Sequence, residues 1–296
     1  METPDLSKIH HPISKLFRWP EKAKDWDQYK LSKEQLQHFE EFGYVSEIKM
    51  LDDQQISVLQ QELNALYDPH HPGNALFYEF STNESTDPTK VLFHALGAWR
   101  ITPGFHDVLW NPRFLMAASQ LLGHQAIRFW HDQLFCKPAR QGGVVAWHQD
   151  YSYWIRSVPM QHLTCWCGLD DADTSNGCLY YVPKSHRWGL LEKPELAGNI
   201  DGILSGLTEE QKSLFNPVAI PLKAGYAAFH HPLLIHGSHA NTTERQRRAF
   251  VLNVFADGTR SNANEPMLKG TPRFNKGEKL QGDFYPLLFD PKQINA

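Results

Sequence analysis

Cysteine is scarce in this sequence, and its spacing excludes two ways of stabilising a fold. Only four of the 296 residues are cysteine. Their positions fit neither a disulfide-rich scaffold nor a paired CxxC zinc site. We therefore expect reduced core residues at Cys136, Cys165, Cys167 and Cys178.

An excess of positive charge and a long apolar run are also missing. The 29 basic and 33 acidic residues leave a net charge of −4 without a basic stripe, which argues against nucleic acid as a partner and favours a small-molecule substrate. No stretch approaches the roughly 20 apolar residues of a membrane span. The polar start, Met1 to Asp5, precedes no apolar signal-peptide core. We expect a soluble, cytoplasmic protein.

The sequence does contain clear helix boundaries in its first part. Ser32 with Gln35, and Asp52 with Gln55, form capping-box patterns ahead of apolar residues at helical spacing. Asn111-Pro112 resembles an N-cap followed by the first helical residue. With 41% apolar residues the chain can bury a large core, and we expect a single domain. It divides into a helical lead-in (1–125) with one short strand expected at 44–48, a β core (126–258) and a C-terminal extension (259–296).

The middle of the chain is a series of short β-rich runs punctuated by Gly and Pro. Because no helical pattern separates most of them, we expect a mainly β fold with flanking helices, a double-stranded β-helix or cupin-like jelly roll. A polar insert at 190–216 interrupts the series and is expected to form a small helix or a lid. The runs are 127–136, 144–147, 163–169, 178–182, 218–222, 227–230 and 249–255.

A His-x-Asp triplet follows one of these runs. About two His-x-acid triplets are expected by chance from 16 His and 33 acidic residues, and the chain has two. In the first, His38 and Glu40 lie on an expected helix, where residues i and i+2 point in different directions. In the second, His148 and Asp150 follow an apolar strand, where alternate residues share a face. The second triplet is therefore the candidate metal site.

A third ligand is expected from the histidines near residue 235. We favour His236, because apolar Leu233 to Ile235 read as a strand end and Gly237 permits a tight turn. Two imidazoles and one carboxylate can occupy one face of an octahedral ferrous ion and leave three positions open. From their spacing alone, these histidines could equally be metal ligands or ordinary polar or core residues. The competing positions for the third ligand are His230, His231 and His239.

Several short motifs occur together in a defined order, and together they resemble the phytanoyl-CoA dioxygenase family. The resemblance runs from about residue 31 to residue 258. It includes a lead-in of Leu31 to Gln35 with Gly43-Tyr44-Val45. The other motifs are Trp147-His148-Gln149-Asp150-Tyr151, Asn176-Gly177-Cys178-Leu179, Val182 to Arg187, His236-Gly237-Ser238 and Arg247-Arg248-Ala249.

The resemblance implies a 2-oxoglutarate-dependent dioxygenase that uses Fe(II), 2-oxoglutarate and O2 to hydroxylate an aliphatic C–H bond of a small organic or lipid-like substrate, releasing succinate and CO2. His148, Asp150 and His236 would bind the iron. Arg247, eleven residues after His236, would bind the distal carboxylate of 2-oxoglutarate, and a guanidinium suits that carboxylate because it binds bidentately and stays charged. Arg245 remains an alternative, whereas Arg248 should face the other side of the strand.

The resemblance also implies roles for residues around these two groups. Ser238, Gln133 and Trp166 would contact 2-oxoglutarate, although purely structural roles are equally open for them. Independently of the resemblance, residues close to Asp150 in the sequence are expected to line a substrate pocket: Trp147, Tyr151, Trp154 and Arg156. Related halogenases carry a small residue in place of the carboxylate, so Asp150 argues against halogenation. A non-catalytic jelly roll that binds a metal or ligand is the alternative function.

Overall fold

Two antiparallel sheets form the centre of the protein in the computed structural model, which describes residues 3–85, 87, 89–196 and 199–294. The larger sheet has the order β1-β10-β7-β12-β4-β3-β2, and β14 also pairs with β4. Its strands are β1 (Tyr44–Lys49), β2 (Glu79–Ser81), β3 (Phe93–Leu96), β4 (Ile127–Lys137), β7 (His162–Gly168), β10 (Tyr226–His230), β12 (Arg247–Ala256) and β14 (Leu287–Phe289).

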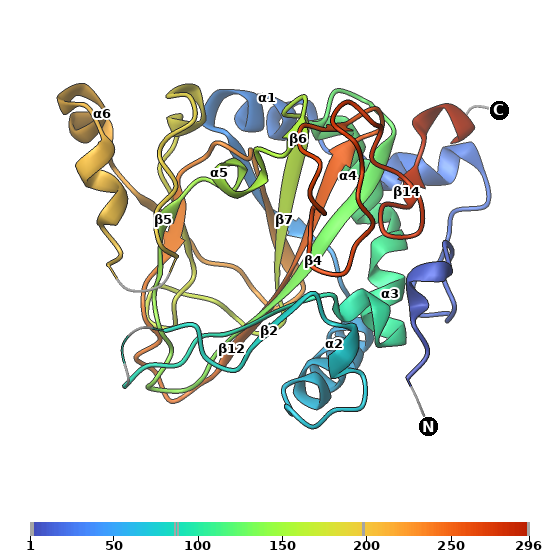
Figure 1. The fold of residues 1–296 in the computed structure, drawn as a ribbon, viewed down its shortest axis with the longest axis horizontal. Coiled ribbons are helices and arrows are strands. Elements are labelled where there is room, and N and C mark those ends of the chain that lie inside the picture. Colours follow the sequence, from blue (N-terminus) through green and yellow to red (C-terminus); the bar gives the residue numbers. More distant parts are fainter. Residues whose placement is uncertain (1–2, 86, 88, 197–198, 295–296) are drawn as a thin grey trace.

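The smaller sheet has the order β5-β11-β8-β9. It consists of β5 (Val145–His148), β8 (Leu179–Tyr181), β9 (Val218–Ile220) and β11 (His236–Ser238). A separate two-stranded ribbon pairs β6 (Ser157–Val158) with β13 (Arg260–Ser261). In Figure 1, β5 lies on one side of the long strands β4, β7 and β12, and the helices α2, α3 and α4 lie on the other.

The helices begin where the capping patterns predict. Ser32 and Gln35 form the expected capping box of α1, and Asp52 and Gln55 form that of α2. The Asn111 side chain accepts from the backbone N–H of Arg113 at the start of α4. None of the helices in the described ranges is long and apolar enough to span a bilayer. The helices are α1 (Lys33–Phe42), α2 (Asp53–Leu66), α3 (Pro103–Asp107), α4 (Pro112–Leu121), α5 (Tyr151–Trp154) and α6 (Glu209–Leu214).

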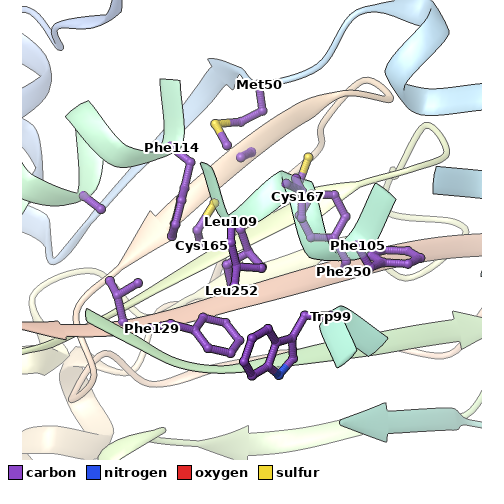
Figure 2. Packing of buried hydrophobic residues seen from close by; sticks show 14 of the residues in the cluster. Met50, Trp99, Phe105, Leu109, Phe114, Phe129, Cys165, Cys167, Phe250 and Leu252 are labelled. Atoms are coloured by element: carbon purple, nitrogen blue, oxygen red, sulfur yellow. The ribbon is translucent and has the colours of Figure 1, made fainter. Parts of the chain in front are cut away.

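Alternation along the long strands separates a face that packs against the helices from a face that points into the interior between the two sheets. On β12, Phe250, Leu252 and Val254 join the main hydrophobic cluster between the large sheet and the helices. Figure 2 shows Phe250 and Leu252 in this cluster with Cys165 and Cys167 of β7. All four cysteines are buried and free, as expected. The helices thus cover one face of the large sheet, and the residues between these apolar positions point to the other face.

Segments on both sides of the expected β core contribute strands to it. β1 pairs with β10 and β3 pairs with β4, although both precede residue 126. β14 pairs with β4 although it lies beyond residue 258. The helical lead-in and the extension therefore contribute strands to the large sheet, and two strands of the lead-in, β1 and β2, form its edges. The insert at 190–216 contains α6 and a 3-10 turn at Gly202–Gly206.

Candidate metal centre

His148, Asp150 and His236 form a buried cluster, with ligand atoms that all lie within 4.8 Å of one another. His148 and His236 are opposite partners on β5 and β11. Asp150 Oδ1 lies 3.5 Å from His148 Nε2 and 3.6 Å from His236 Nε2. Each histidine Nδ1 bonds a backbone carbonyl, of Ala146 and Leu234 respectively. Because a carbonyl only accepts, each Nδ1 carries the proton, and both Nε2 lone pairs are available to a metal.

The backbone brings these side chains together in a different way from the expected one. β5 ends at His148, and Asp150 has helical angles of φ −58° and ψ −42° at the start of α5. The convergence therefore arises from a strand-to-helix turn and not from alternation on one strand. β11 begins at His236, so Leu233 to Ile235 lead into the strand and do not form its end.

Asp150 is held by hydrogen bonds from two residues of the large sheet, and a residue of the smaller sheet bonds one of these in turn. Its Oδ2 accepts from Thr164 Oγ1 at 2.6 Å and from His230 Nε2 at 3.0 Å. The Tyr181 hydroxyl donates to His230 Nδ1 at 2.9 Å. Burial alone would raise the pKa of Asp150, but the surrounding histidines hold it well below its ordinary value. Asp150 is thus kept ionised with Oδ1 directed at the two histidines, and His230 is its partner.

Replacement of Thr164 by Val should weaken iron binding without removing a ligand. The change deletes the hydroxyl that fixes Asp150 Oδ2, and loss of such a supporting bond typically lowers metal affinity about 10- to 100-fold. Fe(II) titration of the apoprotein under anaerobic conditions measures the effect. Thr164→Ser keeps the hydroxyl and should retain most of the affinity. Equal affinities for the Val variant and the wild type would contradict the role assigned to this bond.

Arg247 lies on the inner face of the large sheet, beside the metal cluster and in the same cavity. It is 2% exposed, its Nε has no hydrogen-bond partner in the described part of the chain, and its Cζ lies 5.5 Å from the centre of the Trp166 ring. Burial lowers the pKa of Arg247 to about 10, which still leaves it charged at neutral pH. A buried cation with an unpaired donor requires an anion for compensation.

The neighbouring arginines are engaged elsewhere. Arg248 faces the helices, as expected from alternation, and its guanidinium binds Asp170 at 2.7 and 2.9 Å. Arg245 is exposed and pairs with Asp173 at 2.9 Å. Neither is among the residues that line the cavity. Of these three arginines, only Arg247 lines the cavity that contains the metal cluster.

The cavity has a volume of about 290 Å³ and contains most of the residues expected at the site. Besides the metal cluster and Arg247, its lining includes Ser238, Gln133, Trp166, Trp154 and Arg156. The Arg156 guanidinium also donates to the carbonyls of Pro266 and Met267, at 2.8 Å each.

Two residues expected in the substrate pocket lie outside the cavity lining. The Trp147 ring packs edge-on against Tyr180 and Phe215, because β5 turns this side chain away from its neighbour His148. The Tyr151 hydroxyl donates to the carbonyl of Ser157. In their place, Trp130 and Tyr153 line the cavity.

Sequence reasoning missed two basic residues at this site. His94 bonds Glu84 through Nδ1 and Gln133 Oε1 through Nε2, at 2.8 Å each. Burial alone would lower the pKa of His94, but these two partners raise it. Lys137 is fully buried and bonds Ser238. Continuing the alternation of Gln133 and Phe135 along β4 would have placed Lys137 on the inner face, whereas nothing near His94 in the sequence indicates its role.

The sequence matches the family model described as phytanoyl-CoA dioxygenase (PhyH) over residues 39–249. A phytanoyl-CoA dioxygenase of Arabidopsis thaliana is 31% identical over 165 residues, which cover 54% of this chain and 55% of that protein. Phytanoyl-CoA dioxygenase domain-containing protein 1 of Bos taurus is 31% identical over 171 residues, which cover 56% and 57%. The matched regions thus span little more than half the length of these relatives.

Solved structures confirm the jelly-roll fold. The non-heme alpha-ketoglutarate-dependent carbocyclase SnoK from nogalamycin biosynthesis superposes with a TM-score of 0.70 at 19% identity, covering 92% of this chain and 100% of that one. EctD from S. alaskensis, solved with 2-oxoglutarate and 5-hydroxyectoine, has a TM-score of 0.63 at 20% identity, covering 93% and 95%.

Proposed function

The chain belongs to the phytanoyl-CoA dioxygenase family, and on that premise we propose that it is an Fe(II)- and 2-oxoglutarate-dependent dioxygenase. Its reaction would hydroxylate an aliphatic C–H bond of a small organic or lipid-like substrate and release succinate and CO2. One observation carries the proposal: a buried His-Asp-His cluster lines the same cavity as a buried arginine whose Nε has no hydrogen-bond partner among the described residues.

The cluster fits a ferrous ion. Two imidazole nitrogens and one carboxylate are the ligand set of non-heme Fe(II) oxygenases, and they leave positions open for other ligands. His148 and His236 would each bind through Nε2, because their Nδ1 protons are already used by carbonyls. Asp150 would bind through Oδ1, because Oδ2 is occupied by Thr164 and His230. Bound iron, with 2-oxoglutarate and O2, supplies the oxidising chemistry.

The same cavity also has groups that fit a dicarboxylic acid. Arg247 would bind the distal carboxylate, which would pair its free Nε and offset its buried charge. The guanidinium of Arg247 lies over the face of the Trp166 ring, which stabilises the positive charge. Gln133 Oε1 is engaged by His94, which leaves the amide nitrogen of Gln133 available as a donor. These groups would bind and orient 2-oxoglutarate.

The remaining lining favours a largely apolar substrate. Trp130, Tyr153, Trp154, Met267 and Leu268 contribute to the cavity wall. Such side chains would exclude water from the reacting carbon and orient it toward the iron. Similar solved structures include a carbocyclase and an epimerase. The placement of the substrate C–H bond would therefore decide which reaction takes place. The carboxylate of Asp150 supports oxygen insertion over halogenation.

An anaerobic titration tests the proposal directly. Addition of 2-oxoglutarate to the Fe(II)-loaded protein should produce a visible metal-to-ligand charge-transfer band, and a screen of small organic and lipid-like compounds should then reveal substrate-stimulated succinate formation. Iron binding with neither the band nor succinate would instead identify a non-catalytic metal-binding jelly roll. A product with one added oxygen would establish hydroxylation.

A further inference from the structure

Lys137 is a buried charge that the proposed reaction does not yet use. It is the last residue of β4, is 0% exposed, and stands opposite Arg247 of β12 in the sheet register. The groups that influence it include Arg247 and Cys178 but no carboxylate among the described residues. Burying a charged lysine side chain without an opposite charge or hydrogen-bond acceptors costs folding free energy.

The contacts of Lys137 show which hydrogen-bonding role it has. Its Nζ lies 2.6 Å from Ser238 Oγ, 2.6 Å from the carbonyl oxygen of His239 and 3.4 Å from that of Ser238. Two of these three oxygens are carbonyls, which only accept, and an ammonium has three hydrogens to donate. The structure assigns the bond between Lys137 Nζ and Ser238 Oγ with Lys137 as the donor, so Ser238 Oγ accepts it. The ammonium form has enough hydrogens for all three oxygens.

This arrangement determines what the Ser238 hydroxyl can do. Because its oxygen accepts from Lys137, its own proton remains available for donation. Ser238 lines the cavity together with Arg247, whereas Lys137 itself does not. The free hydroxyl hydrogen and the unpaired Arg247 Nε are thus two donors in the wall of one cavity.

The buried charges of Lys137 and Arg247 also favour a bound anion beside them. Burial and the nearby Arg247 charge hold the pKa of Lys137 well below its ordinary value, and burial also lowers the pKa of Arg247. Two neighbouring buried cations repel each other, and an anion placed beside both would offset that cost. The position is also tightly enclosed, since a Cβ added to Gly177 would lie 3.2 Å from Lys137 Nζ.

We propose that Lys137 is a positioning residue for the distal carboxylate of 2-oxoglutarate. It holds the Ser238 hydroxyl so that its hydrogen is donated to that carboxylate, and it adds a second positive charge beside Arg247. The inference rests on the proposed function, because it concerns the co-substrate of that reaction.

The test compares two 2-oxo acids that differ only at the far end. Both 2-oxoglutarate and 2-oxovalerate can chelate iron through the 2-oxo acid group, but 2-oxovalerate lacks the distal carboxylate. Their dissociation constants are measured anaerobically on the Fe(II)-loaded protein from the charge-transfer band. Lys137→Met removes the ammonium while keeping an unbranched side chain. We expect the preference for 2-oxoglutarate to fall about 10-fold in this variant, which corresponds to one charge-assisted hydrogen bond.

The matched control acts on a metal ligand instead of on the group proposed to bind the distal carboxylate. Thr164→Val perturbs the iron ligand Asp150 and should weaken both acids alike, which leaves their ratio unchanged. A fall in the ratio confined to Lys137→Met supports the inference. An unchanged ratio in Lys137→Met, or the same fall in Thr164→Val, overturns it. Absence of any band in the wild type with 2-oxoglutarate would instead contradict the proposed function itself.

A second variant tests the inference if Lys137→Met does not fold. Ser238→Ala removes the hydroxyl through which Lys137 acts, with a much smaller change in the buried charge. It should also reduce the preference for 2-oxoglutarate over 2-oxovalerate. In the double variant Lys137→Met/Ser238→Ala, the two effects should be less than additive, because both remove the same hydrogen bond. An unchanged ratio in Ser238→Ala would overturn the inference.

Discussion

His236→Ala is expected to abolish turnover and to weaken Fe(II) binding by more than about 100-fold. That figure is the upper end of the loss caused by removing groups that only support a ligand, and removal of a ligand should exceed it. His236 contributes one of the three ligand atoms of the buried cluster. The measurements are anaerobic Fe(II) titration and 2-oxoglutarate-dependent succinate formation.

His239→Ala is the matched control for this prediction. His239 is exposed, lies three residues further along the chain, and is not a member of the cluster. The variant should bind Fe(II) as the wild type does. Comparable losses in His236→Ala and His239→Ala would mean that the effect comes from the fold of this stretch, and iron binding preserved in His236→Ala would show that another residue supplies the third ligand.

Arg247→Met should raise the KM for 2-oxoglutarate about 100-fold or more while Fe(II) affinity stays close to that of the wild type. The change removes a buried guanidinium whose free donor would bind the distal carboxylate. Each hydrogen bond to a charged group contributes roughly 1.5–3 kcal/mol, and two such bonds correspond to about 100-fold or more. Steady-state kinetics at varied 2-oxoglutarate concentration measures the effect.

Arg248→Met is the control on the opposite face of the same strand. It should destabilise the protein by about 2 kcal/mol, because Asp170 would lose its buried charged partner. The KM for 2-oxoglutarate should remain unchanged, since Arg248 does not line the cavity. If Arg248→Met raised this KM as much as Arg247→Met, general loosening of β12 would explain both results and the assignment of Arg247 would fail.

Local patterns predicted much of the architecture. The capping boxes at Ser32 and Asp52 determine where α1 and α2 begin, because they satisfy backbone N–H groups within four residues. Alternation on β12 correctly separated Arg247 from Arg248. Capping boxes and strand alternation depend only on residues that are close together in the chain, so the sequence alone is enough to predict them.

Contacts between segments that are far apart in the sequence could not be predicted in this way. A short strand was expected at 44–48, but no pattern predicted that β1, β3 and β14 would pair with strands of the β core. Trp147 and Tyr151 flank the metal triplet in sequence but point away from the cavity. Adjacency in sequence does not determine the direction of a side chain where a strand turns into a helix.

The sequence by itself determined the family, the jelly-roll class and a candidate set of three ligands and one arginine, because ordered motifs and alternation express these directly. Only the tertiary structure decided among the histidines: it placed His230 behind Asp150 and His236 opposite His148. It also showed that Lys137 bonds Ser238, although these two residues are 101 positions apart along the chain. Such pairs meet only when two sheets fold over a shared interior, so their chemistry depends on packing that no local pattern encodes.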